Sequence, residues 1–108
     1  ALTSNDMPLI ESFVVATEQF AMVEGKHVNW GWKDFRDNHL AGEIEDLSKV
    51  EFRLDFKRLH VAGEMAYATF LFALSPKGNA DVNYGSGRAT VVLTKINGVW
   101  KILNIHTS

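Results

Sequence analysis

The sequence contains no cysteine in its 108 residues, which excludes a disulfide framework and any chemistry that needs a thiolate. It also lacks an excess of one charge, since 13 acidic and 11 basic residues leave a formal net charge of −2. Nucleic-acid recognition usually needs a basic surface, so we expect no nucleic-acid partner. No apolar run approaches the ~20 residues of a membrane-spanning helix, and no charged-then-apolar leader opens the chain. We therefore expect a cytoplasmic protein without a membrane partner.

Several catalytic motifs are missing as well. The four histidines show no i, i+4 pair and no HExxH arrangement, so we predict no metal site. The stretch Gly85-Ser86-Gly87 is not G-x-S-x-G and lacks the Gly-Lys-Ser/Thr ending of a phosphate loop, which argues against a serine nucleophile and a nucleotide. No aspartate stands out as a buried base, and Asp55 alternates with charged neighbours. We predict no cofactor and leave open whether the protein is an enzyme.

What the sequence does contain suits one globular domain over residues 1–108. Its 46% hydrophobic residues supply a single core, and its 22% charged residues supply an ordinary exterior. The clearest local signal is Ile96-Asn97-Gly98-Val99, which lies between two apolar runs rich in β-branched residues. Asn-Gly tolerates the positive φ angles of a type I′ turn, so the last quarter of the chain predicts a β-hairpin.

The other elements are predicted from periodicity. A short helix is expected to begin at Asn5 or Asp6 with Pro8 in its first turn, and residues 33–41 form a second helix that Glu43 to Leu47 can continue. Strands are expected at 15–24, 50–61 and 65–74, a loop at 25–31, a turn at 75–79, and a bulge near Lys57-Arg58 where the apolar parity switches. Helices followed by consecutive strands indicate an α+β domain with helices on one side of a curved sheet.

The closing residues resemble a known family. Three stretches resemble the end of the SnoaL-like group: Gly87-Arg88-Ala89-Thr90-Val91-Val92-Leu93-Thr94-Lys95, then Gly98-Val99-Trp100-Lys101-Ile102, then His106-Thr107-Ser108. That group belongs to the nuclear transport factor two-like superfamily, with the ketosteroid-isomerase-like proteins. His60-Val61 with Gly63-Glu64 before an apolar strand is similar to the association domain of calcium/calmodulin-dependent kinase. The resemblance implies a cone-shaped, cystatin-like α+β fold, whose strongly curved mixed or antiparallel sheet has short helices packed on its concave side.

The resemblance also bears on partners. Members of the family usually open with a long helix across the mouth of the cone, whereas Ala1-Leu2-Thr3-Ser4 resembles only its final turn. Either the chain is a fragment, or the protein manages without that helix. In the second case an apolar groove on the sheet is uncovered, and such a patch normally finds a partner. We therefore expect a homodimer or a higher oligomer.

A pocket on the concave face would be lined, by the same resemblance, by Arg88, Tyr67 and Thr107. The Arg88 guanidinium suits a carboxylate or an oxyanion, although pairing with Glu64 or Asp55 is the alternative. Trp30 and Trp32 flank Gly31 and form either an aromatic lid or a packing contact between helix and sheet.

Histidine is the usual acid–base residue near neutral pH, and His60 and His106 are the catalytic candidates. His39 lies on the apolar side of the second helix, as a packing or ligand-binding residue, and His27 in the expected loop is the weakest candidate.

Three functions follow. The first is a small-molecule-binding pocket for an apolar or aromatic ligand with an acidic group on Arg88. The second is an isomerase, cyclase or dehydratase with a histidine base, and the third is a structural oligomerisation module. Ligand, organism and pathway cannot be read from the residues.

Overall fold

The computed structural model of the protein describes residues 6–108, so the expected helical turn at residues 1–4 lies outside the described residues. The chain opens with helix α1 (Met7–Glu11), followed by a short hairpin of β1 (Ala21–Glu24) and β2 (His27–Trp30). A continuous helical segment then comprises α2 (Trp32–Phe35), the π-helical η2 (Arg36–Leu40) and α3 (Ala41–Leu47). The long strands β3 (Val50–Ala62), β4 (Met65–Pro76), β5 (Gly85–Ile96) and β6 (Val99–Thr107) complete the chain.

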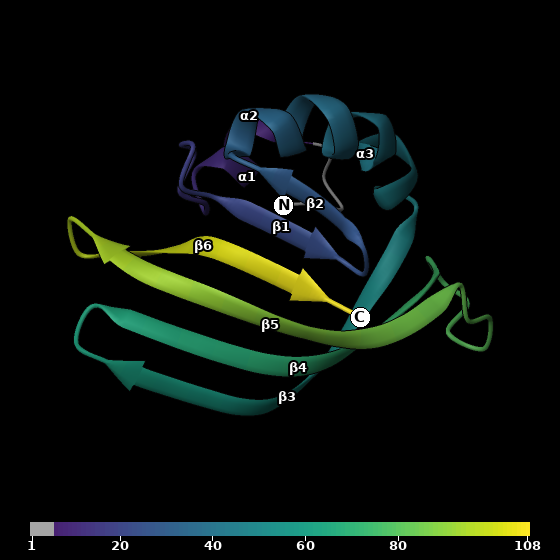
Figure 1. Cartoon of the computed structure of the whole chain (residues 1–108). Coiled ribbons are helices and arrows are strands. Elements are labelled where there is room, and N and C mark those ends of the chain that lie inside the picture. The colour runs from purple at the N-terminus through teal and green to yellow at the C-terminus, as the bar shows by residue number, and fades with distance from the viewer. Residues whose placement is uncertain (1–5) are drawn as a thin grey trace.

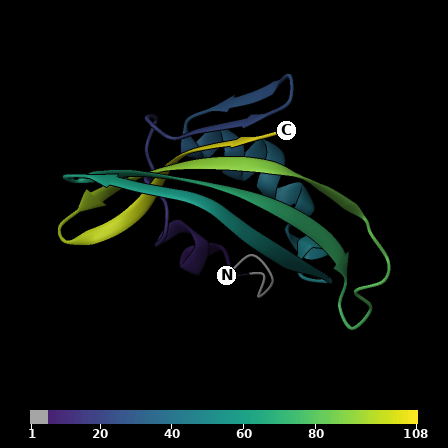
Figure 2. The same ribbon diagram turned by 90° about the horizontal axis from the view of Figure 1, so that it is seen from below.

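The six strands form one strongly curved sheet in the order β2-β1-β6-β5-β4-β3. All neighbours are antiparallel except β1 and β6, which run parallel, so the sheet is mixed. The helical segment packs on the concave side of this sheet (Figure 1), and the view from below shows β3 to β6 in front of the helices (Figure 2). The predicted α+β fold with short helices on the concave side is confirmed.

Local chemistry explains the elements that were predicted correctly. The Asp6 carboxylate accepts a hydrogen bond from the Leu9 amide and caps α1, while Pro8 occupies the first turn, where a missing N–H costs nothing. Asn97 and Gly98 adopt φ angles of 52° and 80°, which a type I′ turn requires. The pairing of β3 with β4 shifts between Phe56 and Arg58, so the predicted bulge is confirmed.

Two expectations about the N-terminal half were wrong. Residues 25–31 are not a loop, because Gly25 and Lys26 form a two-residue turn that pairs β2 with β1. The expected strand at 15–24 is regular only from Ala21, since hydrogen bonds around Thr17 turn the chain just before it. The continuation of the second helix through Glu43 to Leu47 is confirmed.

The sheet presents two different faces. The concave face meets the helices, since Met22 and Ile105 pack there with Phe35 and Leu40 around the buried Phe20. Strand register then assigns the remaining residues to faces. The concave face carries His27, Asn29, Glu24, Thr107, Ala89, Val91, Ala66, Ala68, Phe70, Leu54, Phe56, Leu59 and Val61.

Among residues 6–108, no helix is long and apolar enough to cross a membrane. The cytoplasmic location stays a prediction from the sequence.

The type I′ turn can be tested by comparing two glycines. Neither Gly98 nor Gly42 has an atom within 4 Å of an added Cβ, so the two differ only in backbone conformation. Gly98→Ala forces an L-residue to keep φ near 80° and should lower the free energy of unfolding by about 1 kcal/mol. Gly42→Ala in α3 should raise it by roughly 0.5–1 kcal/mol in urea denaturation. Equal changes in both variants would contradict the turn assignment.

Candidate functional site

Asn29 is the centre of the strongest polar cluster. Its side chain is only 3% exposed, and its Nδ2 donates to Asp34 Oδ2 at 3.0 Å. A carboxylate only accepts, so this bond orients the amide and directs Oδ1 toward two imidazoles. Oδ1 lies 3.1 Å from His27 Nε2 and 2.9 Å from His39 Nδ1. Because an amide oxygen cannot donate, both of these ring nitrogens carry hydrogens.

Asp34 anchors the cluster from the helix. Asn38 Nδ2 donates to its second oxygen at 2.8 Å, so both carboxylate oxygens are bound by side-chain amides. The hydrogen bonds from Asn38 and Asn29 hold the pKa of the Asp34 carboxyl below its ordinary value of 3.8. The carboxylate therefore stays charged and fixes the orientation of Asn29.

His39 is held on both of its ring nitrogens. Its Nδ1 donates to Asn29, while its Nε2 lies 3.3 Å from Glu43 Oε1 and 3.6 Å from Glu24 Oε2. Its ring packs edge-on against Phe35 at 5.0 Å, as the expected shared helix side predicted. With both nitrogens engaged, His39 connects the β1–β2 hairpin to the π-helical turn that carries it.

His27 differs, because only one of its nitrogens has a role in the cluster. Its Nε2 donates to Asn29, and the structure of residues 6–108 gives its Nδ1 no partner. The side chain is exposed on β2, beside the concave face. An imidazole with one N–H fixed by an amide presents its other nitrogen as an oriented acceptor or base.

A gradient of polarity crosses the concave face from this cluster. Strand register aligns one residue from each strand in a single row, which runs His27, Glu24, Thr107, Ala89, Phe70 and Phe56 from β2 to β3. Small residues form the middle of the surface, where Ala66, Ala68 and Ala89 are buried. At the β3 end, large apolar side chains are exposed: Leu54, Phe56, Leu59 and Val61. The row is polar at one end and apolar at the other.

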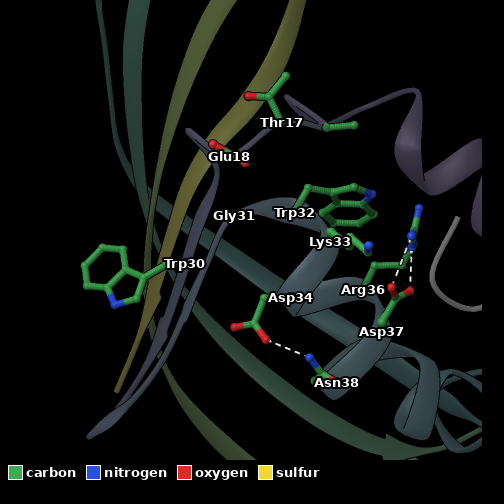
Figure 3. A pocket seen from close by; sticks show the side chains of 11 residues that line it. Thr17, Glu18, Trp30, Gly31, Trp32, Lys33, Asp34, Arg36, Asp37 and Asn38 are labelled. Carbon is green, nitrogen blue, oxygen red and sulfur yellow. Dashed lines mark hydrogen bonds and ion pairs between the residues drawn. The ribbon is translucent and has the colours of Figure 1, made fainter.

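A groove of about 720 Å³ lies on the outer side of α2 and shares Asp34 and Asn38 with the cluster (Figure 3). Its strongest charges neutralise one another. Arg36 Nε lies 2.7 Å from Asp37 Oδ1, and Arg36 Nη1 lies 3.1 Å from Glu11 Oε1. These carboxylates raise the pKa of the guanidinium. This self-pairing leaves Arg36 little capacity for an anionic ligand.

The predicted site residues fall on both faces. His39 and Thr107 belong to the concave side, while Trp32 is buried in the core and donates to Glu11. Trp30 is 73% exposed and points to the other side of the β1–β2 hairpin from Trp32 (Figure 3). The convex face holds His60, Tyr67, Arg88 and His106. Of the two roles left open for the tryptophans, the packing contact describes the buried Trp32, while the exposed Trp30 lies with it along the groove beside α2.

The prediction that Arg88 shares a pocket face with Thr107 is wrong. Thr107 pairs with Ala89, so the alternation of a strand sends the neighbouring Arg88 to the convex face. There Arg88 is exposed and pairs in register with Leu71, and residues 6–108 offer its side chain no ion pair. Tyr67 and His60 stack at 5.7 Å beside a shallow hollow of about 220 Å³ on this face.

The sequence patterns did not indicate His27, Asn29 and Asp34 as a unit. A signal for the hairpin was present in the sequence. Gly25 and Lys26 lie between two short apolar runs that contain Val23 and Val28, and a glycine at the first position of a two-residue turn is typical of a hairpin. Recognising the hairpin would have placed His27 and Asn29 on one face. Within the described part of the chain, no three acidic or histidine side chains are arranged to hold a metal ion.

Comparisons with known proteins support the fold. A family model described as SnoaL-like domain matches residues 1–108, and no curated protein matches the sequence. A protein from Shewanella frigidimarina, named as a candidate ketosteroid isomerase, has a TM-score of 0.81 at 21% identity, covering 100% of this chain and 86% of that chain.

Two further solved structures are similar. A nuclear transport factor two-like protein from Salmonella enterica has a TM-score of 0.74 at 22% identity, over 99% of this chain and 79% of that chain. A candidate association domain of calcium/calmodulin-dependent protein kinase type II from Thiobacillus denitrificans has a TM-score of 0.78 at 12% identity, covering 100% of this chain and 85% of that chain. At these identities the likeness shows the fold, and the predicted resemblance is confirmed.

The role of Asp34 predicts a pH dependence of stability. Its folded pKa is depressed, so its contribution is present above pH 3.8 and is lost as the pH falls through the lower folded value. In urea unfolding at successive pH values, Asp34→Asn should show a smaller loss of stability below pH 3.8 than the unchanged protein. Asn38→Ala keeps the carboxyl but removes one donor, so it should fall between the two. Identical acid profiles for all three proteins would refute this role.

Proposed function

The chain belongs to the SnoaL-like domain family, and we propose that it is a small-molecule-binding protein whose apolar or aromatic ligand lies on the concave face of the sheet. The observation that carries this proposal is the row from His27 to Phe56, which changes from polar to apolar across six strands. Phe56 is 63% exposed and packs against Phe70, with the ring centroids 5.1 Å apart. Covering exposed aromatic surface of this kind with a ligand removes it from water and so favours binding.

The polar end of the row defines the ligand's polar group. Glu24 contributes an exposed carboxylate, Thr107 a hydroxyl, and His27 an Nδ1 acceptor. Acceptors next to a negative charge favour a hydrogen-bond donor, such as a hydroxyl group, and disfavour an acid. The sequence led us to expect a ligand whose acidic group binds Arg88. We now propose instead a ligand whose hydroxyl group lies near Thr107 and Glu24.

Matched alcohols and acids test this ligand class. Geraniol and benzyl alcohol should raise the melting temperature more than geranic acid and benzoic acid do in thermal-shift assays. Phe56→Ala removes apolar contact worth about 1–2 kcal/mol and should weaken geraniol binding roughly 5- to 30-fold. Thr107→Val should reduce the preference for the alcohols.

Arg88→Ala on the convex face is the matched control and should leave every shift unchanged. If Arg88→Ala abolishes the shifts while Phe56→Ala preserves them, the ligand binds the opposite face and the proposal fails.

A second candidate function, an acid–base enzyme, rests on the oriented imidazole of His27. Its Nε2–H is fixed by Asn29, which Asp34 holds in turn, and a base oriented by further groups is the usual arrangement in acid–base catalysis. The Shewanella protein is named as a candidate ketosteroid isomerase. The isomerisation of a ketosteroid is a reaction that transfers a proton. In this case His27 Nδ1 would remove a proton from the carbon next to a carbonyl of the bound ligand and return it to the ligand at another carbon. His27 would then be the base, instead of His60 or His106.

The enzyme reading predicts turnover of a β,γ-unsaturated ketosteroid, followed by the absorbance of its conjugated product. His27→Ala should then lower the rate by roughly 10²–10⁴-fold, the usual contribution of a positioned base. His60→Ala on the convex face should retain the rate. Saturable binding of the steroid without turnover would leave the binding function and eliminate the catalytic one.

A further inference from the structure

Strand β3 is an unprotected edge of the sheet. It is the last strand in the order, it is 13 residues long, and only its β4 side is paired. Leu54 is 50% exposed and Phe56 63% exposed, so the edge is apolar as well as long. Such an edge is a template for pairing with another strand, and natural proteins protect it with bulges, charged side chains or a covering element. Here the bulge is at Lys57, between Phe56 and Arg58, which leaves Glu51 to Phe56 regular and open.

The open segment has a sequence that complements itself when reversed. Its concave side reads Phe52, Leu54 and Phe56, and its convex side reads Glu51, Arg53 and Asp55. The bulged Lys57 lies with the convex set, because its Nζ pairs with Asp55. We propose that two copies of this chain pair through β3 in antiparallel orientation, with a two-fold axis at Leu54. The charges are then complementary: Glu51 lies opposite Lys57 of the second copy, and Arg53 lies opposite Asp55 of the second copy. On the concave side Phe52 lies opposite Phe56, and Leu54 opposite Leu54.

Other registers match fewer of these charges. Moving the axis to Arg53 places Arg53 opposite itself and Glu51 opposite Asp55, while moving it to Asp55 places Asp55 opposite itself and Arg53 opposite Lys57. Like charges directly opposite one another destabilise a sheet. A slip of one residue instead places charged residues opposite apolar ones. An axis at Phe52 or at Phe56 keeps only one combination of opposite charges within these seven residues, Glu51 with Arg53 or Asp55 with Lys57. The axis at Leu54 is the one that gives all four charged residues an opposite partner.

The groups that would form the new pairs are accessible in the single chain. Among residues 6–108, Asp55 pairs only with Lys57 of its own strand, at 2.8 Å and in an exposed position, and such pairs contribute little stability. Within the same residues, Arg53 donates only to the Ala80 carbonyl at 3.4 Å, the limit of a hydrogen bond. Pairing through β3 would also join the apolar ends of two concave faces. The proposed pairing does not depend on the ligand or on catalysis.

Single cysteines test the register, because the natural chain has none. Residues directly opposite in antiparallel strands have Cα atoms about 4.5–5.5 Å apart, within the range that a disulfide spans. Leu54→Cys should therefore form a disulfide-linked dimer under mild oxidation on a non-reducing gel. Leu59→Cys is the control, since its two copies would lie roughly 33 Å apart along the strands. Leu59 is more exposed, at 70%, so random collision would favour the control. Equal or greater cross-linking of Leu59→Cys overturns the proposal.

A charge exchange provides an independent test by sedimentation equilibrium. Asp55→Arg places two arginines opposite each other at two symmetric positions and should weaken the dimer at least tenfold. The double variant Arg53→Asp with Asp55→Arg restores opposite charges and should recover the affinity. Glu18→Arg reverses a charge in the loop before β1, far along the sheet order from β3, and should change nothing. A natural protein that is monomeric at 100 µM, or a double variant as weak as the single one, overturns the proposal.

Discussion

The parallel pairing of β1 with β6 is the contact on which the rest of the molecule depends. It joins the helices and the short β1–β2 hairpin to the four-stranded antiparallel sheet. The segment before β1 extends the same edge, since Val14 bridges to Ile102. This register sets Met22 beside Ile105 in the core and Glu24 beside Thr107 at the polar end of the concave face. One pairing thus closes the core and assembles the candidate site.

The two faces of the sheet differ in chemistry. The concave face has a floor of alanines, a polar end at β2 and an exposed apolar end at β3. The convex face carries charged side chains along β3 and a mixture of polar and apolar ones along β4 and β5. Because β3 belongs to both faces and has a free edge, it is where a ligand surface and a surface for a second copy would meet.

Asn29 has a structural and a functional role in the same hydrogen bonds. A buried amide is costly unless its donors and acceptors are satisfied, and Asp34, His27 and His39 satisfy them. These bonds attach β2 to the π-helical turn, and among residues 6–108 they leave His27 with one oriented nitrogen that has no partner. The requirement to satisfy a buried polar group therefore determines the orientation of the His27 imidazole.

The sequence by itself determined the features that depend on near neighbours. The cap at Asp6, the turn at Asn97-Gly98, the bulge after Phe56 and the long strands all follow from local propensity and alternation, and the closing residues indicated the family. Which face a residue occupies depends on register between distant strands, where one residue of slip reverses every assignment. For that reason Arg88 was placed on the wrong face, whereas Asn29 with Asp34 and His27 became a site only when tertiary pairing set β2 against the helix.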